Sequence, residues 1–322
     1  MARTRVYRGG VLMTEDIPAE DISEHLLHPE ATVWLDMCAP DADDLETVRD
    51  ELGLHQLAIE DAVHVHQRAK IDRYSTHSFV TTYLVRFDPA TGMLTTSEVS
   101  MFVTAQALVT IRADEHLDMA EVVERWDSSD MGESGVGYLL HGVLDYVVDG
   151  YFEAVRELDE QIEALEDLIF MENVDPADVQ RRSLHLRKSL VVLRRVVLPM
   201  REVVNTLMRR DLHYVDEELL PYYHDVYDHI LRASEWTESL RDLVATIRET
   251  QLNLQGNRLN TIMKQVTSWA AIIAVPTAIT GFYGQNIPFP GFDHPFGFWL
   301  SSALIVVLAV VLFRLFKRRD WL

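Results

Sequence analysis

The chain has 322 residues, of which 48% are hydrophobic and 25% are charged, so it is long enough and apolar enough to fold around a core. Its single cysteine, Cys38, excludes an intrachain disulfide framework and fits a reducing compartment. The formal net charge of −22 argues against a nucleic acid partner, because phosphate binding needs a basic face. The negative charge is compatible with cations as partners, or with an acidic surface that is simply solvated. The first residues lack a continuous apolar segment, so we expect no signal peptide and a cytosolic N-terminal region.

Residues 1–135 predict a cytosolic α/β domain. The segment Thr32–Pro40 is typical of a strand that leads into a helix, and Gly53 ends that helix. The segment Ser78–Phe87 is rich in β-branched and aromatic residues, and Ser97–Ala113 supplies two more strands after a turn. We expect a small sheet with helices on its faces.

Residues 136–265 predict a cytosolic stalk of long helices. From Gly137 to Phe170 apolar residues recur at helical spacing, and the opposite face is acidic. A second helix, from about Pro176 to Leu212, is basic, so we expect an antiparallel pair with complementary charge. From about Tyr222 a single helix of more than sixty residues reaches Tyr283. Because so long a helix is unstable alone, we expect it to bundle with copies of itself.

Two apolar segments, 266–283 and 295–316, follow near the end of the chain. Each has about the 17–25 residues that a helix needs to cross a membrane. Lys264 precedes the first segment and Lys317–Arg319 follow the second, whereas the short loop 286–294 has no Lys or Arg. The positive-inside rule then places this loop outside and both termini in the cytosol. We expect a multi-pass protein of the inner or plasma membrane.

One face of the long helix is small or weakly polar through the first apolar segment. It carries Asn260, Met263, Thr267, Ala270, Ala274, Thr277 and Gly281, with Gly284 beyond them. Small residues at this spacing also mark close helix packing, so the periodicity alone leaves both interpretations open. Asn260 and Asn286 at the two ends favour a pore, because carboxamides in a membrane are costly unless they face water, an ion or one another.

Such a pore requires a symmetric oligomer, since two spans cannot enclose a channel. The conducted species should be a cation, because the face offers carbonyl and carboxamide oxygens and no fixed positive charge. Mg²⁺ keeps its water shell and prefers oxygen ligands. Neutral oxygens that bind the hydrated ion are a plausible selective device.

The run YGQN at Tyr283–Asn286 resembles the Tyr-Gly-Met-Asn signature of the CorA magnesium transporters. Further similar stretches follow in the family's order, at Ile59–Asp72, Pro221–His229, Leu259–Gln265 and Lys317–Leu322. The resemblance implies a funnel-shaped homopentamer with a long stalk helix continuous with the first span and a second span around it. It implies inward conduction of divalent cations, chiefly Mg²⁺ and also Co²⁺ or Ni²⁺.

The resemblance also implies roles for individual residues in the selectivity filter, the pore and a regulatory site. The selectivity filter would comprise Gly284, Gln285 and Asn286, with Gln285 standing where the signature has Met. The pore positions Asn260, Met263 and Thr277 coincide with the helical face. Regulatory cytosolic Mg²⁺, bound between subunits, would be held by the carboxylates Asp61, Glu60 and Asp225, with Asp149 and Glu249 as further candidates.

Two alternatives stay open: a Zn²⁺ transporter of the same fold, and a membrane-tethered cytosolic binding or signalling module. No phosphate loop, nucleophile elbow or pair of catalytic carboxylates is present, so we expect no enzyme and no catalytic residues. A tether would need neither the carboxamides nor the face of small residues. The residues do not decide between Mg²⁺, Co²⁺, Ni²⁺ and Zn²⁺, nor whether Gln285 alters ion choice.

Overall fold

The computed structural model describes residues 2–64, 68–89, 91–128, 133–171, 175–285 and 294–322. The chain forms two compact units, residues 1–246 and 247–322. The first unit contains a sheet, its covering helices and the start of the longest helix.

The sheet of the first unit has seven strands in the order β2-β1-β3-β7-β6-β5-β4. Neighbouring strands are antiparallel except for the parallel pair of β3 and β7. The strands are β1 (Ala2–Arg8), β2 (Val11–Glu15), β3 (Ala31–Cys38), β4 (Lys70–Arg73), β5 (Ser78–Asp88), β6 (Met93–Val103) and β7 (Ala107–Arg112). The predicted strands are confirmed, although β6 begins four residues before Ser97. The side chain of Arg112 ties the parallel pair together, since its guanidinium donates to both carboxylate oxygens of Asp36.

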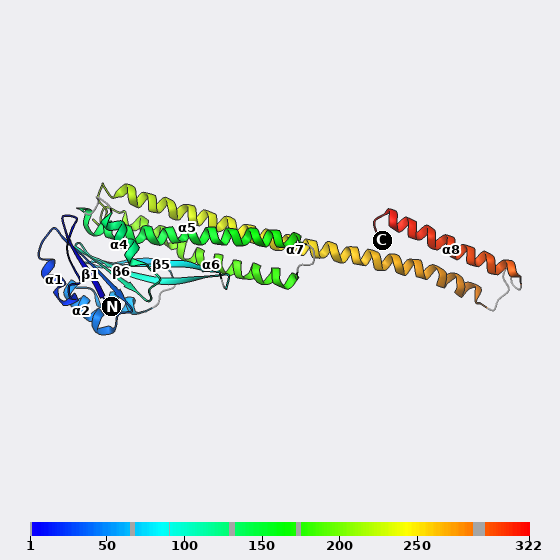
Figure 1. Ribbon diagram of the computed structural model, residues 1–322, viewed down its shortest axis with the longest axis horizontal. Helices are drawn as coiled ribbons and strands as arrows, with labels where there is room; N and C mark the ends of the chain where they lie inside the picture. The colour runs from blue at the N-terminus through cyan, green and yellow to red at the C-terminus, as the bar shows by residue number, and fades with distance from the viewer. Residues whose placement is uncertain (1, 65–67, 90, 129–132, 172–174, 286–293) are drawn as a thin grey trace. The chain divides into compact units, whose positions relative to one another are not determined.

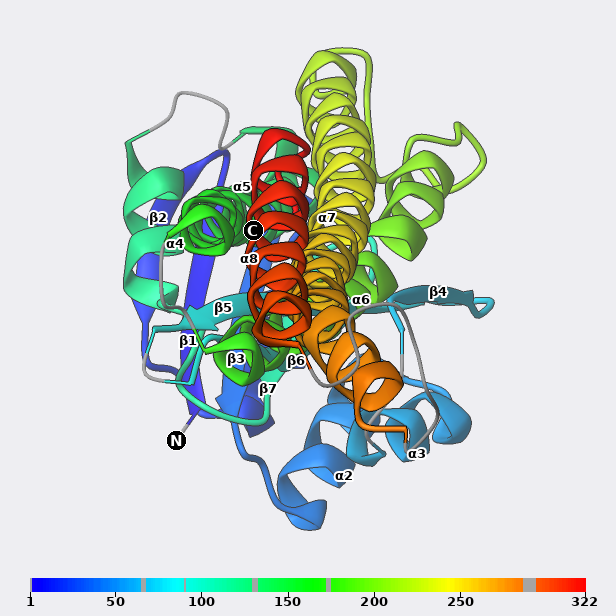
Figure 2. The same cartoon turned by 90° about the vertical axis from the view of Figure 1, so that its right-hand side faces the viewer.

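Short helices cover one face of the sheet: η1 (Ala19–Asp21), α1 (Ile22–His25), α2 (Ala42–Leu52) and α3 (Gln56–Val63). Figure 2 shows α2 and α3 gathered on the same side of the strands. Alternate residues of β3, such as Val33 and Leu35, point into the apolar core on this side. The predicted helix after β3 is confirmed, because Asp41 caps its start in a capping box and Gly53 ends it in the left-handed conformation.

Three further helices pack on the other face: the short α4 (Met119–Asp127) and the long α5 (Gly135–Phe170) and α6 (Pro176–Leu207). Trp34 of β3 meets Trp126 of α4 edge to face, with ring centroids 5.0 Å apart. The helices α5 and α6 lie side by side (Figure 1). In the part of the chain that the structure describes, no ion pair joins α5 to α6, and Arg194 of α6 instead pairs with Glu238 of α7 at 2.5 Å. The predicted pair of adjacent helices is confirmed, and the charges on it find other partners.

The helix α6 ends at Leu207, five residues before the predicted Leu212. The following loop is held by the sheet, because the Tyr214 hydroxyl donates to the carbonyl of Val103 and bonds Ser78 Oγ. His213 takes a left-handed backbone conformation that cannot continue a helix. Tertiary hydrogen bonds thus decide where this helix stops.

The long helix α7 runs from Leu220 to Tyr283, 64 residues without a break, as predicted. Its first turns are fixed against α5, since the Tyr223 hydroxyl donates to the carbonyl of Gly137 at 2.8 Å. Pro221 is tolerated because it stands in the first turn, where its missing N–H has no partner to lose.

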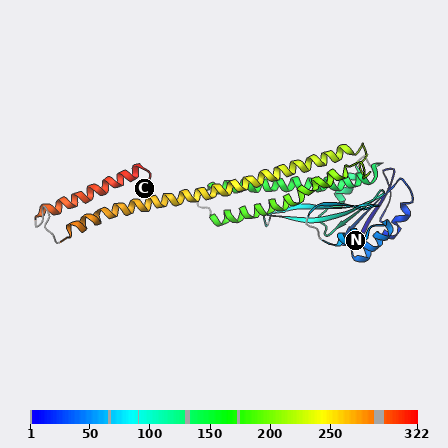
Figure 3. The ribbon, with the colours of Figure 1, turned by 180° about the vertical axis from the view of Figure 1, so that it is seen from behind.

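The second unit holds the end of α7 and the helix α8 (Pro295–Arg318). Both helices are long and apolar enough to cross a membrane. They lie side by side (Figures 1 and 3), and Trp269 of α7 contacts Phe313 of α8 at 6.4 Å between ring centroids. The predicted pair of C-terminal apolar helices is confirmed.

Candidate functional site

A cluster of charged side chains lies where α4, α5 and α7 meet in the first unit. Asp145 and Asp149 of α5 and His229 of α7 each offer a ligand atom, and these atoms lie within 4.8 Å of one another. Asp225, one turn before His229, places its Oδ2 3.7 Å from His229 Nε2. Carboxylates and an imidazole at this spacing are able to hold a divalent cation.

An internal cation occupies the same cluster. Nη1 of Arg125 lies 3.0 Å from Asp145 Oδ2 and 2.9 Å from Asp149 Oδ2. Its Nη2 lies 3.0 Å from Glu121 Oε1 on α4. The guanidinium therefore offsets part of the negative charge of the carboxylates in a single chain, and a metal ion has to displace it or bind through water.

Partial burial sets the protonation of the cluster. Burial, with repulsion from Asp149, raises the pKa of Asp145 above its ordinary value. Burial lowers the pKa of the adjacent His141, whose ring touches Tyr222 and Tyr223. Both shifts disfavour the charged forms, so a cation that binds here competes with protons on Asp145.

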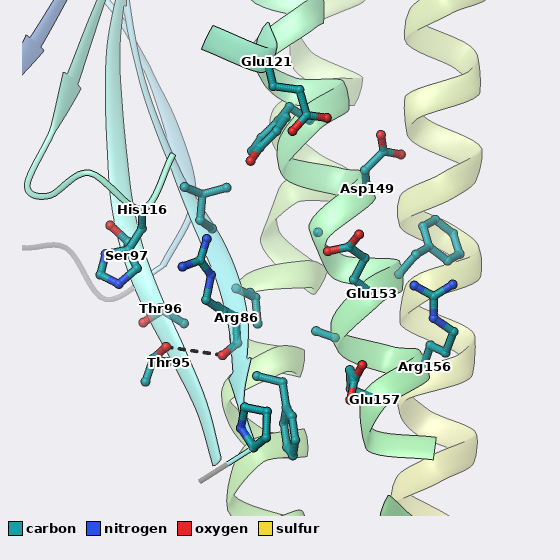
Figure 4. Close-up of a pocket in the computed structure, with 18 of the residues that line it drawn as sticks. Arg86, Thr95, Thr96, Ser97, His116, Glu121, Asp149, Glu153, Arg156 and Glu157 are labelled. Atoms are coloured by element: carbon teal, nitrogen blue, oxygen red, sulfur yellow. Dashed lines mark hydrogen bonds between the residues drawn. The ribbon is translucent and has the colours of Figure 1, made fainter. Parts of the chain in front are cut away.

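A cavity of about 770 Å³ opens beside the cluster, between the β5–β6 hairpin and α5. Figure 4 shows its two walls, with Arg86 and Ser97 from the strands and Asp149, Glu153 and Glu157 from α5. Charges of both signs line it, so the cavity does not select one sign of ligand. It gives water access to Asp149.

The predicted carboxylates Asp61 and Glu60 lie on α3, outside this cluster. Asp61 Oδ2 accepts a hydrogen bond of 2.5 Å from Lys70 Nζ, which also lies 2.6 Å from Asp72 Oδ2. Glu249 is exposed on the part of α7 that belongs to the second unit. Within one chain the structure thus brings together Asp149 and Asp225, but not the other predicted ligands.

Three residues of the cluster were missed by the sequence reasoning: Asp145, His229 and Arg125. A usable signal existed for two of them, because Asp145 stands four residues before Asp149 and His229 four residues after Asp225. Such spacing places both members of each pair on one helix face. Arg125 comes from a separate helix, and no local pattern points to it.

The predicted pore-lining face of α7 is exposed in the single chain. All seven of its positions are exposed: Asn260, Met263, Thr267, Ala270, Ala274, Thr277 and Gly281. Buried Ser268 and the half-buried Ile272 and Val275 lie on the opposite side of the helix. That side is the one available to α8, so α8 leaves the small, weakly polar face free.

At the end of α7 the chain closes a last turn, in which Gly284 N–H donates to the Thr280 carbonyl at 2.8 Å. Gln285 N–H donates to the Phe282 carbonyl at 3.3 Å. The third residue of the predicted filter, Asn286, lies outside the described residues, as does most of the loop 286–294.

The acidic chain, its two helices apolar enough to cross a membrane and the exposed, weakly polar face of α7 fit a membrane protein that handles cations. A family model described as CorA-like Mg²⁺ transporter protein matches residues 29–318, and the chain belongs to this family. It is thus a divalent-cation transporter rather than an enzyme.

Characterised relatives match over most of their length. The cobalt/magnesium transport protein CorA of Thermotoga maritima is 29% identical over 283 residues, covering 87% of this chain and 80% of that protein. The putative metal ion transporter YfjQ of Bacillus subtilis is also 29% identical, covering 96% and 95%. The zinc transport protein ZntB of Yersinia pestis is 25% identical, covering 92% and 85%.

Solved structures confirm the fold. The CorA magnesium transporter from Methanocaldococcus jannaschii superposes with a TM-score of 0.83 at 22% identity, covering 100% of this chain and 99% of that one. Full-length CmaX superposes with a TM-score of 0.76 at 22% identity, covering 98% and 96%.

Proposed function

We propose that the protein conducts divalent cations, chiefly Mg²⁺, through a ring of identical subunits lined by α7. The observation that carries this proposal is the exposed face of α7 from Asn260 to Gly281, opposite the side available to α8. A small, weakly polar helix face left free in a membrane needs a partner, and copies of itself around a water-filled axis supply one. By resemblance to the family the ring is a homopentamer.

The proposed direction is into the cytosol. With the loop 286–294 outside and both termini inside, in the inner or plasma membrane, a dication gains about 4.6 kcal/mol per 100 mV of membrane potential. The potential therefore supplies the driving force without another energy source.

Selectivity is proposed to reside at the outer end of α7. Carboxamides of Asn286, backed by carbonyl groups near Gly284, would bind the water shell of the ion rather than strip it. Mg²⁺ dehydrates reluctantly, so neutral oxygens suit it better than a ring of carboxylates that holds it too tightly for release.

Cytosolic Mg²⁺ is proposed to regulate the pore by binding between subunits, through Asp61 and Glu60 of one chain and Asp225 and Asp149 of the next, with Glu249 as a further candidate. The donors fit Mg²⁺, being mostly carboxylate oxygens. Lys70 and Arg125 already neutralise Asp61 and Asp149 in the single chain. The bound ion would compete with these cations, and its loss would loosen the interface and open the pore.

Flux through purified protein in proteoliposomes tests the pore. Replacing Asn286→Ala should abolish selective Mg²⁺ uptake, because the hydrated ion loses the carboxamides that bind its water shell. The matched control Gln265→Ala removes an exposed carboxamide from the other side of α7 and should leave uptake intact. Normal Mg²⁺ uptake by the Asn286→Ala protein would disprove the assignment of Asn286 to the selectivity filter.

Zinc is a second candidate ion, because the zinc transport protein ZntB is similar over nearly the whole chain. The same vesicles distinguish the two when Mg²⁺, Co²⁺, Ni²⁺ and Zn²⁺ are offered separately. Faster uptake of Zn²⁺ than of Mg²⁺ would favour the second candidate.

A further inference from the structure

The outer side of α6 carries an apolar ridge that no other described part of the chain covers. Leu184, Val191 and Leu198 follow one another at seven-residue steps and are 48%, 46% and 37% exposed. Residues that attach α6 to its own unit, such as Leu186 and Leu193, lie on the opposite side of the helix. Because seven residues make almost two turns, the ridge runs nearly straight along the helix.

Basic side chains border this apolar ridge on both sides. Exposed Lys188 and Arg195 lie four residues beyond Leu184 and Val191, and a second row lies three residues beyond the ridge, at Arg187, Arg194 and Arg201. Among the described residues no ion pair reaches Lys188 or Arg195, whereas Arg194 pairs with α7. An apolar ridge between rows of cations fits an acidic partner.

The same hairpin presents an acidic ridge on α5. Glu153, Glu160 and Asp167 are exposed and also stand seven residues apart, on the side of α5 away from buried Val155 and Ile162. In the described part of the chain, none of the three forms an ion pair with α6. Both helices therefore carry complementary ridges with the same period; Glu160 and Asp167 lie beyond the cavity, whereas exposed Glu153 also lines it.

We propose that the apolar ridge of α6 packs beside the acidic ridge of α5 in a second copy of this chain. The inference rests on the proposed ring. A closed ring of identical subunits uses heterologous contacts, so each subunit presents two different surfaces, one to each neighbour. A basic helix and an acidic helix on one hairpin supply two such surfaces, and their charge favours the ring contact over like-with-like pairing.

Ring symmetry also determines the register. Rotation about the ring axis does not change the height of any residue along that axis. For helices parallel to the axis, α6 therefore meets the α5 of the neighbouring subunit at the same height at which it lies beside the α5 of its own chain. Phe170 ends α5 and Pro176 begins α6, which sets that level to within about one helical turn. Counting from these ends then places three acids opposite three bases: Asp167 with Arg181, Glu160 with Lys188, and Glu153 with Arg195.

The same register explains how the apolar ridge fits. Leu184 falls opposite exposed Ala164 of α5, which has a small side chain and stands beside the acidic ridge. Val191 falls opposite Glu157, whose methylene groups can cover it. Apolar contact at the centre and ion pairs at the border form one continuous interface.

Cross-linking between single-cysteine chains tests the contact. In a Cys38→Ser background, a chain with Glu160→Cys and a differently tagged chain with Lys188→Cys are co-expressed and purified together. Oxidation should give a disulfide that joins the two tags, and neither chain alone should give dimers above background. The control chain carries Arg210→Cys, at a side chain 90% exposed outside the hairpin helices. A mixed disulfide no more frequent than with this control overturns the inference.

Charge reversal gives a second test. Lys188→Glu with Arg195→Glu should lower the salt concentration at which the ring dissociates in light scattering, and adding Glu153→Lys with Glu160→Lys should restore it. Arg209→Glu with Arg210→Glu makes the same charge change elsewhere and should have no effect. If the combined variant is not restored, or dissociates only when anionic lipid is removed, the basic rows face lipid and the inference is wrong.

Mg²⁺ flux separates this inference from the proposed function. If the wild-type ring conducts Mg²⁺ but the Glu160→Cys and Lys188→Cys chains give no mixed disulfide, only the contact between α6 and α5 is disproved. A wild-type protein that forms no ring and conducts no divalent cation removes the proposed function as well.

Discussion

At the scale of single residues, internal cations stand where a regulatory metal is expected. Lys70 lies within 2.6 Å of carboxylate oxygens of both Asp61 and Asp72, and Arg125 bridges Asp145 and Asp149. These contacts relieve the repulsion between carboxylates without any bound metal. Under the proposed regulation, Mg²⁺ would have to compete with these internal cations, which should lower its affinity for the carboxylates.

Lys70→Met should therefore strengthen the protection that Mg²⁺ gives against limited proteolysis, moving its midpoint to lower Mg²⁺ concentration. Asp61→Ala with Asp225→Ala should move the midpoint the opposite way, because two ligands are lost. Lys70→Arg keeps the positive charge and serves as the control. A midpoint unchanged in both variants would show that Asp61 is not part of the sensor.

A buried histidine makes the first unit sensitive to acid. His77 is 2% exposed, and burial, together with nearby His55, lowers the pKa of His77 below the ordinary 6.5. Because the folded pKa is below the unfolded one, the stabilisation is fully present above about pH 6.5 and is lost as the pH falls through the folded pKa. Melting followed by tryptophan fluorescence should show a larger loss on acidification for the wild type than for His77→Phe. Equal losses would rule out His77 as the cause.

At the scale of elements, the junction of α5 with the loop before α7 depends on a glycine. A Cβ added to Gly137 would lie 1.9 Å from the carbonyl oxygen of Tyr214 and 2.9 Å from Leu219 Cδ1. The backbone of the loop cannot move aside easily, since the Tyr214 hydroxyl anchors it to the sheet. Close approach, rather than helix propensity, explains a glycine in the first turn of α5.

Gly137→Ala should lower the free energy of unfolding by about 1–3 kcal/mol or more, as overpacking does. Gly256→Ala on α7 is the matched control, because no atom lies within 4 Å of its added Cβ. It should raise stability by about 1 kcal/mol, through the better helix propensity of alanine. Thermal melting of both variants measures the difference. If Gly137→Ala left the free energy of unfolding unchanged, the loop that contains Tyr214 would have to move aside to accommodate the added Cβ.

At the scale of the whole molecule, the free face of α7 has a direct test. In a Cys38→Ser background, Thr277→Cys should make Mg²⁺ flux sensitive to a charged thiol reagent, because the modified side chain would stand in the pore. Val275→Cys, half-buried on the side available to α8, should remain insensitive. The measurement is flux in proteoliposomes before and after the reagent. Equal block of both variants would contradict a pore lined by this face.

Local patterns in the sequence determined much of the architecture. The strands around Ser78–Phe87, the helix capped by Asp41 and the unbroken α7 follow from residue type and period within one segment. The two apolar helices follow from length and the scarcity of charge, and the excess of acids argued against a nucleic acid partner. The motif YGQN carried the resemblance to the family that the comparisons confirm.

Only the tertiary structure decided which charges meet. Arg125 reaches Asp145 and Asp149 from another helix, and Lys70 of β4 neutralises Asp61 of α3. Packing also ended α6 at Leu207 and sent Arg194 to α7 instead of α5. Periodicity records which side of a helix is buried, but the partner of an exposed charge depends on how separate elements pack. For that reason the sequence predicted the faces of these helices, and the fold decided what each face touches.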